Sequence, residues 1–224
     1  MKTLFIEARY NKSAVNVVKK IKLPKKIGLV GAIQFTEQLK EIKEYLESKG
    51  HEVTIGGQLL GCNANRAIGI NHKVDAFLCI GSGDFHPIEV ARRTKKEVIV
   101  ANPITGKVGK ISKEEVINYE KNLKGKIMKF IAARKVGILV SNKPGQENLK
   151  YALQLKDKIK DKECFIFLDN DIKIDEFDNF REIDVWINTA CARVEGKGIV
   201  NIEDVLEYIY KGKIGWNLEN PLVR

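Results

Sequence analysis

Two short motifs of this chain each occur twice at the same spacing. The first motif, Lys-Ile-Gly-Leu-Val at 26–30, returns as Lys-Val-Gly-Ile-Leu at 135–139. The second, Val-Asp-Ala-Phe-Leu at 74–78, returns as Ile-Asp-Val-Trp-Ile at 183–187, again 109 positions later. Self-similarity at a fixed offset is the signature of repeated structural units. We therefore expect two related lobes rather than one unrepeated domain.

Each copy reads as strand, helix, strand, turn, strand and helix. We expect helices at 37–49 and 147–160, followed by strands at 52–55 and 163–168. Continuous apolar strands that alternate with helices are typical of a parallel sheet covered on both faces. The predicted fold class is α/β, with two Rossmann-like lobes built on parallel sheets and related by the internal repeat. The carboxyl ends of such strands share one edge, where α/β folds bind ligands.

Beyond the lobes, the pattern predicts an N-terminal extension and a linking helix. The predicted segments are an N-terminal strand and helix at 1–24, a first lobe at 25–110, and the linking helix with the second lobe at 111–224. The extension has a strand pattern at 3–8 and a helix pattern at 12–20, and these need a lobe or another chain to pair with. The linking helix is expected at 113–133, because Ser112 and Glu115 have the spacing of a capping box.

Composition and charge narrow the class of protein. No apolar run approaches the roughly 20 residues that a membrane helix needs, and Glu7 and Arg9 follow the first apolar run too closely for a secretory signal. We therefore expect a cytoplasmic protein with no membrane partner. The net charge of +10 would suit a nucleic-acid partner. However, the lysines are mixed with glutamates on the expected helices, and aromatic and basic residues do not interleave, so nucleic acid is disfavoured.

The four cysteines fall into two classes of environment. Cys79 and Cys164 lie within apolar strand runs, where free cysteine packs as a small hydrophobic residue. Cys62 and Cys191 have small and polar neighbours, which place both in turns at the ligand-binding edge. In a cytosolic protein, two loop cysteines favour metal or redox chemistry over a disulfide. Because they form no local metal motif, spacing alone leaves open that they are ordinary loop residues.

The segment Gly-Ser-Gly-Asp-Phe-His-Pro at 81–87 ends a predicted strand and opens a helix. Gly81 and Gly83 would let the backbone approach a ligand, and a helix N-terminus favours an anionic group. A plain strand-to-helix connection explains the same residues. His86 has a similar alternative, in which it caps the helix or packs on its neighbour.

These motifs together resemble the diphthamide synthase family, the 2-(3-amino-3-carboxypropyl)histidine synthase subunits. Gln-Leu-Leu-Gly-Cys-Asn at 58–63 and the segment 74–87 are similar to the family's second domain. Asp-Val-Trp-Ile-Asn-Thr-Ala-Cys-Ala-Arg at 184–193 is similar to the cysteine motif of its third domain, and residues 3–9 resemble the last strand of its first domain. The resemblance runs from about residue 25 onward in family order.

The resemblance implies a specific chemistry. In the family, three domains each give one cysteine to a [4Fe–4S] cluster whose open iron holds S-adenosylmethionine. A 3-amino-3-carboxypropyl radical formed from that cofactor is added to a histidine of translation elongation factor 2. By this resemblance Cys62 and Cys191 are cluster ligands. The residues expected to bind the cofactor are Gly81, Ser82, Gly83, His86, Asn188 and Arg193. No residue is assigned as a catalytic acid or base.

The chain also departs from the family pattern. It shows no counterpart of the first domain with its cysteine, so 1–24 reads as a remnant of that domain, and Ala192 stands where the family has proline. Two cysteines are too few to hold a cluster, and a zinc site would be equally incomplete. Three hypotheses follow: a partner subunit carrying the missing domain completes the site, two copies of the chain share a cluster, or the chain is a non-catalytic paralogue that binds a ligand or partner.

Overall fold

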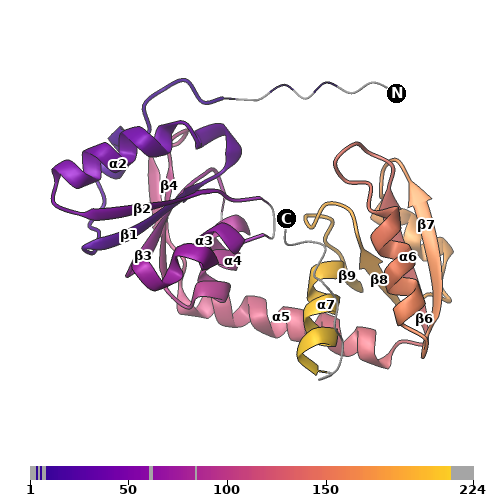
Figure 1. Ribbon diagram of the computed structural model, residues 1–224. Coiled ribbons are helices and arrows are strands. Elements are labelled where there is room, and N and C mark those ends of the chain that lie inside the picture. The colour runs from indigo at the N-terminus through magenta and orange to yellow at the C-terminus, as the bar shows by residue number, and fades with distance from the viewer. Residues whose placement is uncertain (1–3, 5, 7–8, 61–62, 84, 213–224) are drawn as a thin grey trace. The chain divides into compact units, whose positions relative to one another are not determined.

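The computed structural model describes residues 4, 6, 9–60, 63–83 and 85–212 of the chain (Figure 1). The chain divides into two compact units, Met1–Asn118 and Tyr119–Arg224, here called lobe one and lobe two. The predicted segment boundaries after residues 24 and 110 stay predictions. In the described residues, no helix is both long and apolar enough to cross a membrane.

Lobe one is built on a five-stranded sheet in the order β2-β1-β3-β4-β5. Its strands are β1 Lys26–Gly31, β2 Glu52–Gln58, β3 Ala76–Ile80, β4 Glu97–Asn102 and β5 Lys107–Lys110. The first four strands are parallel, and β5 pairs antiparallel with β4 at the edge. The sequence pattern predicted parallel sheets and did not include this antiparallel edge strand. A tight hairpin joins the two strands, and Gly106 adopts a φ of 68° there.

Helices cover both faces of the lobe-one sheet (Figure 1). The helical elements are α1 Val15–Val18, η1 Ile33–Phe35, α2 Gln38–Ser48, α3 Asn65–Ile70, η2 Asn71–Lys73 and α4 Phe85–Thr94. α1 and α2 pack on one face and α3 and α4 on the other, because each presents an apolar stripe to the sheet. The expected helix at 12–20 forms only at α1, which packs into the core of lobe one. The expected strand at 3–8 lies mostly outside the described residues.

Lobe two repeats this plan on a four-stranded parallel sheet in the order β7-β6-β8-β9. Its elements are β6 Lys135–Ser141, α6 Leu149–Lys158, β7 Glu163–Asp169, η3 Ile174–Asn179, β8 Val185–Asn188, β9 Ile199–Asn201 and α7 Ile202–Gly212. The predicted α/β class with two related, mostly parallel sheets is confirmed.

The helix α5, Lys113–Ala132, leads from lobe one into lobe two. Its predicted capping box is present, since the Ser112 hydroxyl accepts a hydrogen bond from the Glu115 N–H at 3.1 Å. In return the Glu115 carboxylate accepts one from the Ser112 N–H at 2.7 Å. Hydrogen bonds to its carboxylate from the side chain and the backbone of Ser112 hold the pKa of Glu115 below its usual value.

The repeated motifs have a steric cause. Gly28 lies beside Phe77 of the next strand, and Gly137 lies beside Trp186 in the same register. A Cβ atom on Gly28 would come 2.6 Å from the Phe77 ring, and one on Gly137 would come 2.4 Å from the Trp186 ring. Each copy of the motif therefore needs glycine because an aromatic ring lies flat across it.

Candidate functional site

The predicted glycine turn of lobe one lies at the carboxyl end of β3. Gly81 donates its N–H to the Ala101 carbonyl at 3.0 Å, while Ser82 and Gly83 are exposed. Neither Gly81 nor Gly83 is among the glycines with positive φ, and a Cβ would meet nothing closer than 4.0 Å at either position. The fold therefore requires glycine at neither position. The prediction that the turn admits a ligand stays open.

The remaining lobe-one residues of the prediction are only partly described. Cys62 lies outside the described residues. His86 is half-buried in the first turn of α4, so the predicted opening of a helix after the glycine turn is confirmed. The predicted roles of Cys62 and His86 stay predictions.

In lobe two, the buried amide of Asn188 holds the loop that carries Cys191. Asn188 ends β8 and is 1% exposed. Its Nδ2 group donates to the Cys191 carbonyl at 2.8 Å and to the Asn201 side-chain oxygen at 2.9 Å. Its Oδ1 atom accepts the Ala190 N–H at 3.0 Å. The whole amide therefore faces the protein.

Further polar groups fix the same loop. The Thr189 hydroxyl donates to the Leu139 carbonyl at 2.7 Å, and Asn148 donates to the Thr189 carbonyl at 2.6 Å. Asn201 donates to the Ala192 carbonyl at 3.4 Å. The backbone around Cys191 is thus held from several sides.

Sequence reasoning singled out Asn188 but missed Thr189, Asn148 and Asn201. One sequence feature could have indicated such residues: a polar residue directly follows an apolar strand run, as in Ile-Val-Asn at 199–201. Polar residues at the ends of buried strands must find partners, and here the nearest loop supplies them.

The cysteines separate as predicted where the structure describes them. Cys79 is 2% exposed and Cys164 is 7% exposed, and burial raises the pKa of both thiols. Neither suits a ligand role, because the thiolate is the metal-binding form. Cys191 is a free, half-buried cysteine, and Arg193 nearby in the loop is exposed.

The chemistry of Cys191 fits one ligand of an iron–sulfur cluster and no more. A thiolate is the usual soft ligand for such a cluster. Among the residues that the structure describes, no three histidine, cysteine, aspartate or glutamate side chains gather as a metal site would require. A cluster held here would need ligands beyond Cys191.

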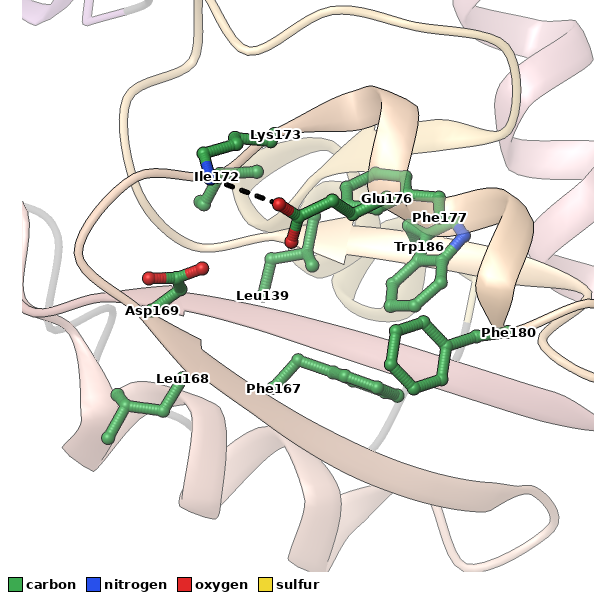
Figure 2. Close-up of a pocket in the computed structure, with 10 residues that line it drawn as sticks. All are labelled: Leu139, Phe167, Leu168, Asp169, Ile172, Lys173, Glu176, Phe177, Phe180 and Trp186. Carbon is green, nitrogen blue, oxygen red and sulfur yellow. Dashed lines mark hydrogen bonds and ion pairs between the residues drawn. The ribbon is translucent and has the colours of Figure 1, made fainter.

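Lobe two also has a pocket of about 190 Å³ on the face of its sheet where Trp186 lies (Figure 2). Its walls are mainly apolar and include four aromatic side chains, with Phe177 stacked on Trp186 at 4.3 Å between ring centroids. At its mouth Lys173 pairs with Glu176 at 3.0 Å, which raises the pKa of Lys173. None of the predicted site residues lines this pocket, so it is separate from the Cys191 loop.

Comparison with known proteins assigns the chain to a family. Residues 1–197 match the family model described as "Putative diphthamide synthesis protein". The 2-(3-amino-3-carboxypropyl)histidine synthase of Pyrococcus horikoshii is 34% identical over 86% of this chain and 59% of its own length. Subunit 1 of the same synthase from Encephalitozoon cuniculi is 24% identical over 75% of this chain and 50% of its own.

A solved structure agrees with this match. The crystal structure of Dph2 from Pyrococcus horikoshii with a 4Fe-4S cluster superposes with a TM-score of 0.75 and 31% identity. That match covers 91% of this chain and 64% of the crystallised chain, so this chain spans less than two thirds of the relative. With most of its length matched in both sequence and fold, the chain belongs to the diphthamide synthesis protein family.

Proposed function

We propose that this chain is a cluster-binding component of a 2-(3-amino-3-carboxypropyl)histidine synthase. The observation that carries the proposal is the Cys191 loop, where a free thiol on a hydrogen-bonded turn follows a parallel strand. The Pyrococcus relative of the same fold was crystallised with a 4Fe-4S cluster. Cys62 and Cys191 would each give a thiolate to a [4Fe–4S] cluster. The chemistry that such a cluster supplies is reductive cleavage of S-adenosylmethionine, whose 3-amino-3-carboxypropyl group is transferred to a histidine of translation elongation factor 2.

The other predicted residues would bind the cofactor. Arg193 is an exposed residue, and a guanidinium group can pair with a carboxylate through two parallel hydrogen bonds. Gly81, Ser82 and Gly83 form an open turn without Cβ atoms at the two glycines, which suits the approach of a polar ligand. His86 is the second residue of α4, the helix that follows this turn. These five residues orient the cofactor in the proposal and carry no proton-transfer role.

A third thiolate must come from elsewhere, because the chain offers two loop cysteines. A partner subunit with a further loop cysteine is the favoured source. A relative named as subunit 1 is consistent with an enzyme of more than one chain. A homodimer that shares a cluster is the alternative arrangement. We place this assembly in the cytoplasm.

The test is anaerobic reconstitution with iron and sulfide of the wild-type chain, Cys62→Ala and Cys191→Ala, each alone and together with a candidate partner subunit. The control is Cys164→Ala, because this cysteine is buried in the same lobe as Cys191. We expect absorbance near roughly 400 nm, typical of thiolate-bound clusters, in the wild type and the control, and its loss in both loop variants. Retention of full iron content by either loop variant would contradict the proposed ligands.

A second measurement separates an enzyme from a binding protein. The reduced protein is mixed with S-adenosylmethionine and elongation factor 2, with and without a candidate partner subunit. Modified histidine and released methylthioadenosine are then quantified by mass spectrometry. Equal amounts of both products are expected, since each transfer leaves one methylthioadenosine. A chain that binds S-adenosylmethionine but forms neither product with any partner would instead be a non-catalytic paralogue.

A further inference from the structure

The amide of Asn188 is placed to act on Cys191 rather than on a cofactor. It is 1% exposed, and all three of its hydrogen bonds stay within the protein. One of them goes to the carbonyl of Cys191 itself, which also accepts the Val194 N–H at 2.9 Å. The backbone at Cys191 therefore has little freedom to turn, and the direction of its Cα–Cβ bond is set by that backbone.

Asn201 extends the same restraint to the far side of the cysteine. Its side-chain oxygen accepts from Asn188, and its Nδ2 donates to the Ala192 carbonyl. Asn188 ends β8 and Asn201 ends β9, two neighbouring parallel strands. The pair thus ties the residues on both sides of Cys191 to the rigid edge of the sheet.

The internal repeat shows that the strand itself does not need this amide. The position 109 residues before Asn188 is Cys79, which lies in the same register and is buried as an apolar side chain. The position that repeats Cys191 is Ser82, in an exposed turn. A buried amide costs free energy unless every polar atom is satisfied. Of these two repeated positions, only the one in lobe two has the amide, and only there does the following loop carry a candidate metal-ligating cysteine.

We propose that Asn188, with Asn201, is a positioning residue that holds the Cys191 thiolate ready for metal binding. This inference rests on the proposed function, in which Cys191 is a cluster ligand. A loop that is ordered before binding loses less conformational entropy when it takes up its ligand. Outer-shell residues that orient ligands typically contribute about 10- to 100-fold to metal affinity.

The first test uses the metal-free full chain. The variants are Asn188→Ala, Asn188→Asp and Asn201→Ala. The control is Asn71→Ala, because Asn71 is a half-buried amide of lobe one that donates to the Thr94 carbonyl at 3.2 Å. Iodoacetamide labelling of each cysteine is followed by peptide mass spectrometry, with circular dichroism to verify folding.

We expect Asn188→Ala to speed labelling of Cys191 by roughly three- to tenfold, because a released loop opens more often. Labelling of Cys164, buried in the same lobe, should not change. Asn188→Asp keeps the acceptor for the Ala190 N–H but loses both donors, so it should restore only part of the protection. Wild-type labelling rates in all three lobe-two variants would overturn the proposal. Should Asn188→Ala not fold, Asn188→Asp and Asn201→Ala decide.

The second test follows the reconstituted protein. Asn188→Ala should lose iron to a chelator about 10- to 100-fold faster than the wild type, and the electron paramagnetic resonance signal of its reduced cluster should shift. A purely structural role would lower thermal stability in Asn188→Ala and Asn71→Ala alike without changing that signal. If the wild type binds no cluster either alone or with the candidate partner subunit, the proposed function fails, yet the labelling rates still decide whether Asn188 positions Cys191.

Discussion

Lobe one and lobe two each contain a sheet of similar plan, but the two sheets differ in how deeply one face is covered. Both place a glycine of the first repeated strand against an aromatic ring of the next. In lobe one that ring, Phe77, belongs to a layer of twelve buried residues under α3 and α4. In the described part of lobe two, Trp186 clusters on its face with two other buried residues, and the 3-10 helix η3 takes the place of α3.

The two lobes also differ where the chain leaves the repeated strand. After β3 the chain forms an exposed turn and then α4, which packs on the sheet. After β8 it forms the Cys191 loop and reaches β9 with no intervening helix. Buried Asn188 and Thr189 hold that loop, at the positions where lobe one has apolar Cys79 and Ile80. The two lobes therefore have similar sheets because of the repeat, whereas the segments that follow β3 and β8 differ. Only the segment after β8 carries a candidate metal ligand.

Truncating the paired aromatic residues should give the largest effect on stability. Phe77→Ala and Trp186→Ala should each cost about 3–5 kcal/mol of unfolding free energy. Phe77→Ala should lie at the upper end despite its smaller ring, because Phe77 is fully enclosed. Trp186 borders the pocket of about 190 Å³, so its partly exposed neighbours can close over the space. Native-state hydrogen exchange, read separately for each lobe, measures both values.

That measurement is needed because a chain of two compact units need not unfold in one step. A larger loss for Trp186→Ala than for Phe77→Ala would mean that the cover of lobe two is as tight as that of lobe one. The conclusion that the Trp186 face of lobe two is covered less deeply than the Phe77 face of lobe one would then be wrong.

Adding a methyl group at the repeated glycines should have the next largest effect. Gly137→Ala and Gly28→Ala should each cost about 1–3 kcal/mol, since the new Cβ meets a ring at 2.4 Å and 2.6 Å respectively. In the background of Trp186→Ala, Gly137→Ala should cost almost nothing, because the ring that it strikes is gone. Gly125→Ala in α5 is the matched control, and it should stabilise the chain slightly because nothing lies within 4 Å of its Cβ position. Equal costs for Gly137→Ala with and without Trp186 would disprove the steric explanation.

The sequence predicted the fold best where residues of neighbouring strands constrain one another. The Gly28 and Asp75 motif recurs as Gly137 and Asp184, and the predicted strands form at both copies. The capping box is local in sequence and was equally predictable. The antiparallel strand β5 was missed, although Gly106 in the preceding turn was a hairpin signal.

The site was less predictable because its contacts are set by folding. The sequence placed Asn188 near Cys191, and a cofactor contact was the expectation that followed from the family resemblance. Only the structure shows that the amide points inward to the loop and to Asn201, thirteen residues away. The direction of a side chain at a strand end depends on the neighbouring strand.

The smallest expected effect on stability is at the repeated aspartates. Each accepts at least one hydrogen bond from a backbone N–H group at the start of the first strand of its lobe. Asp184 accepts the N–H groups of Arg134 and Lys135, both at 2.8 Å, whereas Asp75 accepts that of Lys26 at 3.3 Å. Asp184→Asn should cost about 1 kcal/mol after allowance for solvent exposure, and Asp75→Asn less. Lobe-specific hydrogen exchange measures both changes.

The contribution of Asp184 depends on pH with a definite sign. The hydrogen bonds from Lys135 and Arg134 lower the pKa of Asp184 below its ordinary value. The stabilisation is therefore fully present above the ordinary aspartate pKa of about 4 and is lost as the pH falls through the lowered value. Hydrogen exchange of lobe two should accelerate over that acid range in the wild type and show a smaller acid response in Asp184→Asn. An unchanged acid response in the variant would mean that Asp184 does not distinguish the two lobes.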